Sequence, residues 1–317
     1  MIKLDIVIVT FNRLDKLKKT LAHYQSQTVP FRTLIVVNNH STDGTDNYLK
    51  EWQKENSTYN KHVITLNENR GGAGGFHEGQ KYAMTLNPDW IYVSDDDAYP
   101  NYDMIERFYN FIDNNDSNDI AAICAAVYNI DESIAYDHRS HYIIKNGVDF
   151  NKIPSVKSDY NKNYFEIDLL SYVGSFINTN ALAKVGFCEK DLFIFYDDTE
   201  HSIRLSKYGK LYCCPSIIVK HDSGISDDTK SSSILISWRE YYYIRNKIHM
   251  LKKHHKIAAI YLSIKYLYSS FKSLLVSLLK PQRIHNFKII ACAICDAWTN
   301  HLGKHKKYQP GFYIYNN

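Results

Sequence analysis

The sequence has little of what marks secreted or membrane-spanning proteins. Its six cysteines in 317 residues form no spaced disulfide framework, which fits a reducing compartment. The apolar run at the N-terminus passes directly into polar sequence and lacks a signal-peptide cleavage site, so residues 4–11 are expected to form a strand. These absences predict a cytoplasmic protein.

Metal-binding or redox pairs of cysteines are also missing. Cys292 and Cys295 are separated by two residues, but they lie in an apolar, helix-like stretch. That stretch has no second cysteine pair and no well-spaced histidine near it. We therefore expect neither a zinc site nor a redox site there.

Acidic residues are scarce in the last quarter of the chain. Residues 231–317 contain 14 Lys/Arg and only two Asp/Glu, whereas residues 1–230 carry a net charge of −8. Hydrophobic residues make up 44% of the chain, which is enough for a packed core and excludes wholesale disorder. We expect a first domain at 1–230 and a basic helical region at 231–317, whose charge suggests an anionic partner.

No apolar run of membrane-spanning length is free of charge. Residues 257–279 come nearest, with apolar residues at helical spacing, but Lys265 and Lys272 lie seven positions apart on one helix face. An amphipathic helix is the better interpretation. The sequence leaves two arrangements open: a helical cap that forms a homo-oligomer, or peripheral contact with an anionic membrane at the inner face of the cell membrane.

The first 100 residues alternate between strand and helix patterns. Strand-like runs occur at residues 4–11, 32–39, 62–69 and 90–97, with helix-like runs at 15–27, 43–56 and 76–86 between them. Further strand-like runs occur at 121–130 and 211–221. Apolar strands separated by helices predict an α/β fold with a mostly parallel sheet.

Four polar loops follow the carboxyl ends of these strands, where open α/β sheets bind ligands. They comprise residues 10–13, 38–43, 70–75 and 95–97. The third is a glycine loop, which lets a backbone approach a sugar or phosphate closely. It has neither the spacing of a dinucleotide fingerprint nor the Gly-Lys-Ser/Thr ending of a P-loop.

Three adjacent carboxylates, Asp95 to Asp97, end the strand-like run at 90–97. Asp95 and Asp97 suit a Mg²⁺ or Mn²⁺ ion that also contacts phosphate, and His221, at another strand end, is a candidate third ligand. Asp96 should point away from the other two if strand geometry persists. Solvated acids at a strand end are the plainer alternative.

A second acidic group, Asp197, Asp198 and Glu200, follows an aromatic run at 193–196, and Arg204 lies one helical turn later. A carboxylate in this setting can accept a proton from a sugar hydroxyl. The alternative is a helix N-terminus with favourable acids in its first turn.

The stretches DIVIVTFNR, VVNNHSTDGT, DDD, FYDDTEHSIR and VKH, in this order, resemble the family 2 glycosyltransferases, which have a GT-A fold. The resemblance covers roughly residues 4–225. SWREYYYIRNKI (237–248) and ICDAWTNHLGK (294–304) resemble the tails of the bacterial rhamnosyltransferase and galactofuranosyltransferase branch. The double-glycine loop ending in Phe76 is most similar to the galactofuranosyltransferases.

The resemblance implies a GT-A Rossmann-like sheet flanked by helices, with a C-terminal helical appendage. It implies inverting transfer from a nucleotide-sugar donor to a glycan acceptor that is lipid-linked. Asp95, Asp97 and His221 match the metal ligands for Mn²⁺ or Mg²⁺, and Asp198 matches the catalytic base, with Asp197 as its neighbour. Arg204 is expected to steady Asp198 or the diphosphate. Donor contacts are expected from Thr10, Asn12, Arg13, Asn38, Asn39, Arg70, Gly71, Gly72, Gly74, Gly75 and Asp96.

The donor is expected to be UDP-galactofuranose, with dTDP-rhamnose second. Asn38 or Asn39 stands where many relatives carry Asp, at the position facing the nucleotide base, and an asparagine amide can still pair with a uracil or thymine edge. A nucleotidyltransferase is a rival, but it would carry a basic, glycine-rich N-terminal signature. Nucleic-acid binding by the Tyr-rich basic tail is another rival to the glycosyltransferase hypothesis. The acidic clusters would repel phosphate unless a cation bridged them, so we expect no nucleic-acid partner.

Overall fold

The computed structural model describes residues 2–115, 119–224, 237–276 and 281–309. The chain divides into two compact units. The first contains residues 1–141, 153–190 and 198–223, and the second contains 142–152, 191–197 and 224–317. The sequence-based boundary at residue 230 therefore leaves out two short segments, 142–152 and 191–197, that belong to the same unit as the C-terminal helices.

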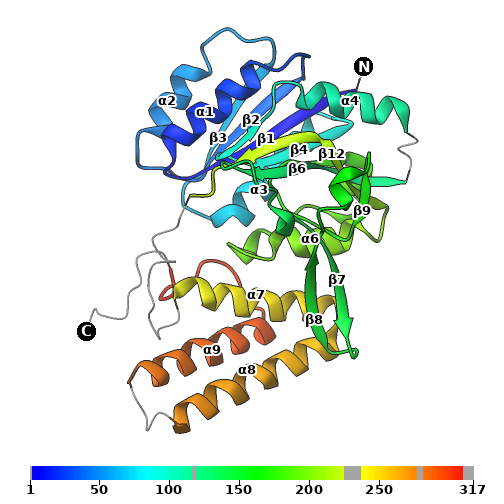
Figure 1. Ribbon diagram of the computed structural model, residues 1–317. Coiled ribbons are helices and arrows are strands. Elements are labelled where there is room, and N and C mark those ends of the chain that lie inside the picture. The colour runs from blue at the N-terminus through cyan, green and yellow to red at the C-terminus, as the bar shows by residue number, and fades with distance from the viewer. Residues whose placement is uncertain (1, 116–118, 225–236, 277–280, 310–317) are drawn as a thin grey trace. The chain divides into compact units, whose positions relative to one another are not determined.

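A nine-stranded, mostly parallel sheet forms the centre of the first unit (Figure 1). Its main path runs β3-β2-β1-β4-β11-β6-β12-β5, and β9 pairs with β12. The strands are β1 (Leu4–Thr10), β2 (Thr33–Asn38), β3 (Asn60–Thr65), β4 (Trp90–Asp95), β5 (Ala98–Pro100), β6 (Ile120–Asn129), β9 (Phe165–Ile167), β11 (Ser175–Asn178) and β12 (Lys210–His221). The expected α/β fold is confirmed.

Strand alternation gives this sheet two apolar faces. Ile6 and Ile8 of β1 face one core cluster, and Val7 and Val9 face the other. The first cluster includes side chains of α1 (Leu14–Gln25), α2 (Thr45–Trp52) and α4 (Met104–Asn114). The second includes side chains of α3 (Gly71–Thr85), α5 (Thr179–Val185) and α6 (Asp197–Leu205). Helices thus cover both faces, so the carboxyl edge is left for polar loops.

The strand expected at 90–97 ends early, and this shapes the site. β4 stops at Asp95, the chain turns at Asp96 and Asp97, and residues Ala98–Pro100 start a new strand, β5. β5 pairs antiparallel with the end of β12, which sets His221 opposite Ala98. This pairing of β5 with β12, which is far away in sequence, fixes the turn between β4 and β5.

The expected glycine loop at 70–75 is instead the start of α3, which begins at Gly71. Its glycines let the helix lie close against β1. A Cβ on Gly79 would come 2.3 Å from Val7 Cγ1, and one on Gly75 would come 2.5 Å from Val9 Cγ1. The sequence reads as a loop because glycine disfavours helices, but the gain from close packing outweighs that preference.

Gly79→Ala is expected to destabilise the first unit, because its methyl group would overlap the short, branched side chain of Val7. Overpacking of this kind costs about 1–3 kcal/mol. Gly72→Ala is the matched control, since a Cβ there meets nothing within 4 Å and Ala favours helix. Urea denaturation measures both; equal stability of the two variants would contradict the packing argument.

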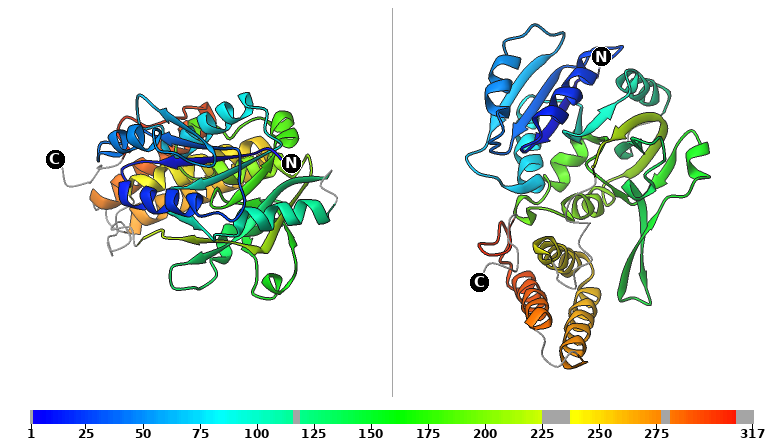
Figure 2. Two further views of the ribbon diagram at one scale, coloured as in Figure 1. Left: turned by 90° about the horizontal axis from the view of Figure 1, so that it is seen from above. Right: turned by 60° about the vertical axis from the view of Figure 1, so that its left-hand side comes forward.

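The second unit is mainly three helices, α7 (Trp238–His254), α8 (Lys256–Val276) and α9 (Pro281–Thr299), which lie side by side (Figure 2).

A smaller sheet of order β10-β7-β8 comprises β10 (Leu169–Leu170), β7 (Arg139–Lys145) and β8 (Asp149–Pro154). The remaining short elements are the 3₁₀ turns Tyr136–His138, Asp159–Asn161 and Lys190–Leu192. In the part of the chain that the structure describes, every helix is too short or too polar to cross a bilayer.

Candidate active site

The turn between β4 and β5 brings together the three expected metal ligands. Ligand atoms of Asp95, Asp97 and His221 all lie within 4.8 Å of one another. The backbone N–H of Asp222 donates to the carbonyl of Asp97 at 2.8 Å and continues the β5–β12 pairing to the edge. Because β12 carries the histidine and β4 leads into the aspartates, the sheet itself positions the group.

The chemistry of Asp97 fits a cation. Its Oδ1 is buried and makes no hydrogen bond to the described residues, yet His221 Nε2 lies only 3.3 Å away. Two ligands of one octahedral Mg²⁺ are about 3 Å apart, since each bond is about 2.1 Å. A buried carboxylate oxygen facing a ring nitrogen without a hydrogen bond is therefore arranged as a ligand pair would be.

Basic side chains balance the remaining carboxylate oxygens. Arg13 lies 2.7 Å from Asp97 Oδ2 and 3.3 Å from Asp96 Oδ1, and the Thr10 hydroxyl donates to Asp96 Oδ2 at 2.6 Å. Burial raises the pKa of Asp96 to about 6, against the opposing charge of Arg13. Burial would also raise the pKa of Asp97, but His221, Arg13 and Lys16 hold it below its usual value.

Sequence reasoning missed two neighbours of the acidic turn. Lys16, on the first turn of α1, lies 3.6 Å from Asp97 Oδ2 and 3.3 Å from Asp222 Oδ1. Tyr99 donates to the other oxygen of Asp222. Lys16 stands three positions after Arg13, which is helical spacing, so its place on the same helix face was the available signal.

The two asparagines expected to face a nucleotide base differ in their hydrogen-bond partners. Asn38 and Asn39 are buried, and Asn39 exchanges hydrogen bonds with Arg70 N–H and the Gly71 carbonyl. The Asn38 side chain accepts from Ser41 N–H. Asn39 thus fixes the start of α3, whereas Asn38 Nδ2 is buried without a hydrogen bond to the described residues, and the expected base contact stays a prediction.

Several of the expected donor contacts are accessible. Asn12, Arg13 and Arg70 are exposed or partly so, and Gly72 is partly exposed. Asn12 has a left-handed backbone, φ 51°, and ties its loop to Thr42, whose N–H donates to its side chain. Gly74 and Gly75 are buried, and the space around them holds Arg70 and Val9.

The second acidic group begins α6. Asp198 Oδ1 accepts from the hydroxyl of Thr199 at 3.0 Å, and Oδ2 makes no hydrogen bond to the described residues. Glu200 is fully buried and pairs with Arg204 at 2.8 Å. The paired, buried Glu200 is unsuited to take a proton from a ligand, which leaves Asp198 and Asp197.

Arg204 pairs with Glu200 in this structure, and its expected contact with the diphosphate stays a prediction. Its guanidinium donates to Glu200 and to the carbonyls of Val185, Gly186 and Phe187, which end α5, and not to Asp198. A cation at a helix C-terminus satisfies carbonyls that have no partner within the helix. Arg204 therefore anchors α6 to the end of α5.

The aromatic run before α6 has an unusual backbone in the second unit. Phe193, Phe195 and Tyr196 all have positive φ, between 64° and 70°. Such conformations cost about 1–3 kcal/mol each for residues other than glycine, and they persist only where neighbours hold them. Trp90 and Phe76 are buried in the two cores of the first unit, so neither ring offers a surface on which a sugar could stack.

Arg245 and Asn246 of α7 hold this strained segment. The Asn246 amide donates to the carbonyls of Leu192, Ile194 and Phe195 at 2.7–3.0 Å, and Arg245 donates to Leu192 at 3.0 Å. Both side chains are fully buried. The stretch 237–248 thus clamps the backbone that leads directly into Asp197 and Asp198.

Asn246→Ala is expected to lower kcat by about 10- to 100-fold with little change in the donor KM, because a released segment misplaces the following carboxylates. Ser263→Ala is the matched control: it removes a part-buried hydrogen bond from Trp298 in the same unit without touching the clamp. Steady-state kinetics and thermal unfolding of both separate positioning from stability. An equal fall in kcat for the control would refute the role.

A family model described as Glycosyl transferase family 2 matches residues 5–186, more than half of the chain. The chain belongs to this family. It is therefore a glycosyltransferase, as its sequence suggested, and the nucleotidyltransferase alternative is set aside. The matched residues include the acidic turn, whereas Asp198 and His221 lie beyond them.

Two relatives of this chain are named for the transfer of different sugars. The chain is 26% identical over 255 residues to the dTDP-rhamnosyl transferase RfbF of Shigella flexneri, covering 78% of this chain and 80% of that protein. It is 26% identical over 227 residues to the galactofuranosyltransferase GlfT1 of Mycobacterium tuberculosis, covering 71% of each. Both branches expected from the sequence are thus represented.

The fold of this family 2 member is shared with solved glycosyltransferases. GalNAc-T7 with UDP, GalNAc and Mn²⁺ superposes with a TM-score of 0.60 at 15% identity. The match covers 95% of this chain but only 58% of GalNAc-T7. At this identity the likeness shows the GT-A fold.

A cavity of about 760 Å³ adjoins the acidic turn of this glycosyltransferase. His221 lines it together with Tyr136, Asp137 and His138, and the His138 ring meets the His221 ring edge-on. Its lining comes mainly from the irregular region after β6, where the sequence shows no regular pattern, so these residues were not predicted. The cavity offers polar groups beside the candidate metal ligands.

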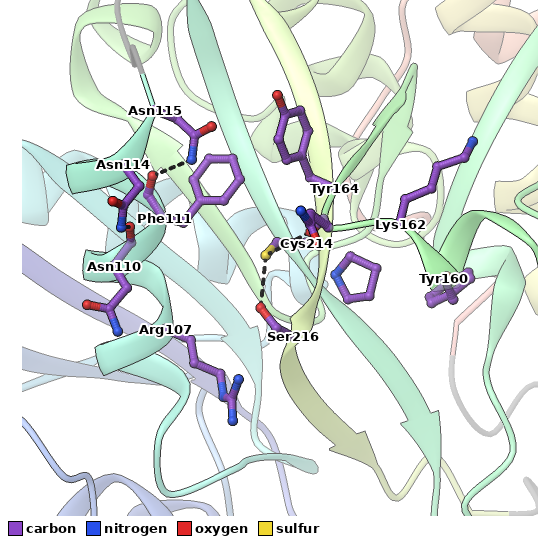
Figure 3. Close-up of a pocket in the computed structure, with 12 residues that line it drawn as sticks. Arg107, Asn110, Phe111, Asn114, Asn115, Tyr160, Lys162, Tyr164, Cys214 and Ser216 are labelled. Carbon is purple, nitrogen blue, oxygen red and sulfur yellow. Dashed lines mark hydrogen bonds between the residues drawn. The ribbon is translucent and has the colours of Figure 1, made fainter.

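A second cavity of about 650 Å³ lies elsewhere in the same unit (Figure 3). Amide and aromatic side chains line it, from α4 and from the segment before β9. None of its lining residues belongs to the acidic turn or to the start of α6. Cavity size alone therefore does not locate the active site.

Cys292 has a polar neighbourhood that the sequence did not suggest. Its sulfur lies 3.5 Å from Asp296 Oδ2 and 3.9 Å from His305 Nε2. However, His305 Nδ1 accepts hydrogen bonds from the N–H groups of Lys307 and Tyr308, so Nε2 carries the proton. A protonated Nε2 has no lone pair for a metal, so these side chains form a hydrogen-bonded group.

His201 should make stability depend on pH. It is fully buried between the Tyr172 hydroxyl and the Gly186 carbonyl, and burial lowers its pKa to about 3. The unfolded chain binds a proton below pH 6.5 and the folded chain does not, so stability falls as pH drops below that value.

His201→Gln is expected to reduce the slope of unfolding free energy against pH by about 1.4 kcal/mol per unit below about pH 6. Urea denaturation between about pH 7.5 and pH 5 measures the slope. The exposed His40→Gln is the matched control. Parallel curves for the wild type and the His201 variant would contradict a buried neutral histidine.

Proposed function

We propose that this family 2 enzyme is a metal-dependent inverting glycosyltransferase, with Asp95, Asp97 and His221 as ligands of Mn²⁺ or Mg²⁺. The observation that carries the proposal is the buried Asp97 Oδ1, which has no hydrogen bond to the described residues and faces His221 Nε2 at 3.3 Å. When bound, the cation neutralises charge on the departing diphosphate. The Mn²⁺ in the solved GalNAc-T7 structure is consistent with this.

Asp198 is the proposed base. Its Oδ2 takes the proton of an acceptor hydroxyl while that oxygen forms a bond to the anomeric carbon of the donor. The bond from that carbon to the diphosphate breaks on the opposite face, so the configuration inverts. Asp197 is the alternative base, and the clamp of Arg245 and Asn246 keeps both carboxylates at the start of α6.

The accessible residues of the expected donor loops are the proposed donor contacts. Arg13 and Arg70 bring positive charge, Asn12 brings an amide, and the first turn of α3 at Gly72 offers backbone N–H groups to phosphate. Thr10 and Asp96 act indirectly, because their hydrogen bond and the Asp96 contact hold Arg13 in place. The cavity beside His221 gives room for a sugar.

The proposed donor is UDP-galactofuranose, and the galactofuranosyltransferase GlfT1 among the relatives supports this choice. A rhamnosyl donor is the second candidate. The match to RfbF supports it, because that match covers more of this chain than the match to GlfT1 does. The proposed acceptor is a lipid-linked glycan in cell-surface polysaccharide synthesis. The basic C-terminal region, with 14 Lys/Arg against two Asp/Glu, supports peripheral contact with an anionic membrane at the cytoplasmic face.

A donor screen tests the proposal. Purified enzyme is incubated with Mn²⁺ or Mg²⁺ and each of UDP-galactofuranose, dTDP-rhamnose, UDP-glucose and GDP-mannose, and released nucleotide is measured. We expect the greatest release from UDP-galactofuranose and none with chelator. Preference for dTDP-rhamnose would select the second candidate, and full turnover with chelator would refute metal dependence.

A further inference from the structure

Most of the large apolar side chains of α8 are exposed. Ile257, Ile264, Tyr268, Phe271 and Leu275 are between 51% and 69% exposed. Together with Ile260 and Tyr261 they fall within an arc of about 100° when each residue turns the helix by about 100°. We call these seven residues the α8 stripe. It is the face that a core-packed helix would bury.

The buried side chains of α8 are small ones, apart from Leu262. Ala258, Ala259, Leu262 and Ser263 are buried, and the Ser263 hydroxyl accepts from the indole N–H of Trp298 on α9. A helical cap would bury the large apolar side chains of the amphipathic helix expected at 257–279. In α8 these side chains are mostly exposed and the small ones are buried. Packing within the unit does not explain the α8 stripe.

Charge identifies the partner. Lys265 and Lys272 border one side of the α8 stripe and Lys256 the other, and α8 contains no Asp or Glu. Lys265 makes a long contact of 3.7 Å with Asp149 and stays half exposed. Tyr261 and Tyr268 add rings with polar tips, which favour the boundary between lipid headgroups and chains.

We infer that the α8 stripe inserts into the headgroup region of an anionic bilayer, with α8 lying in the membrane plane. The inference rests on the proposed function, in which the acceptor is lipid-linked. A second copy of this chain fits less well, because two such faces in contact would bring their lysine borders together without an acid to pair them. An anionic surface complements both the stripe and its border.

Vesicle flotation tests the inference with Ile264→Ser/Tyr268→Ser, which alters two exposed side chains and leaves the packed face intact. We expect wild type to bind vesicles of phosphatidylglycerol and phosphatidylethanolamine, and the variant to bind at least about ten-fold more weakly. Binding to phosphatidylcholine alone should be weaker for both, and added salt should weaken binding to the anionic vesicles. Ile143→Ser/Tyr102→Ser removes other exposed apolar residues and should bind as wild type does.

Equal vesicle binding by wild type and the α8 variant would overturn the inference. So would a wild-type dimer in light scattering that the α8 variant loses, combined with no vesicle binding. Nucleotide release without vesicles is measured on the same preparations. A variant that turns over donor but does not float supports the membrane role, whereas absent turnover with intact flotation of the wild type refutes only the proposed chemistry.

Discussion

Asp198→Asn is expected to reduce kcat by about 10²- to 10⁴-fold and to leave the donor KM nearly unchanged. Asn preserves the hydrogen bond from Thr199, because its side-chain oxygen still accepts, so the start of α6 should keep its shape. What is lost is an atom that can take the proton of the acceptor hydroxyl. Single-turnover transfer to a glycan acceptor measures the chemical step directly.

Two neighbouring substitutions make that result specific. Glu200→Gln should affect stability more than turnover, because Glu200 is buried against Arg204. Asp197→Asn should cost much less turnover than Asp198→Asn. If Asp197→Asn lost turnover and Asp198→Asn kept it, the base would be Asp197, one position earlier on the same helix.

Asp97→Ala is expected to abolish Mn²⁺ binding in the micromolar range and to lower kcat by about 10³-fold. The substitution removes the buried Oδ1 that faces His221 and the Oδ2 that pairs with Arg13. Without it, two of the proposed ligands remain. Electron paramagnetic resonance of added Mn²⁺ reports binding independently of turnover.

Asp96→Asn is the control for this substitution. Asp96 lies between the two proposed ligands in sequence, yet its carboxylate contacts Thr10 and Arg13. The variant should therefore keep Mn²⁺ binding and lose donor affinity through Arg13. Unchanged Mn²⁺ affinity in Asp97→Ala, or loss of Mn²⁺ binding in Asp96→Asn with retention in Asp97→Ala, would show that the ligand assignment is wrong.

Most of the sheet was predictable because its strands are continuous apolar runs separated by helices. β1, β2 and β4 begin and end within two residues of the runs that predicted them. The separation of Asp96 from its neighbours was also predictable, although its cause is the turn before β5 rather than strand alternation. β5 itself could not be predicted, because a strand of three residues is too short to show a pattern in the sequence.

Other parts of the site depend on distant packing and could not be predicted. Gly75 and Gly79 read as loop residues until Val9 and Val7 are seen beneath them. The partner of Arg204 is set by the end of α5, and the clamp of Asn246 by carbonyls some fifty positions earlier. The amphipathic spacing of α8 was clear, but which face packs depends on the helices beside it.

The pairing of β5 with β12 also bears on how the enzyme is made. Tyr99 and Asp222, joined at this pairing, are 123 positions apart, so the proposed third metal ligand leaves the ribosome long after the first two. Contacts over such separations form late, because closing the long loop of chain costs entropy before the contact contributes any stabilising free energy. A nascent chain that ends before β12 therefore carries two aspartates and no complete site, and metal affinity can report that the first unit has finished folding.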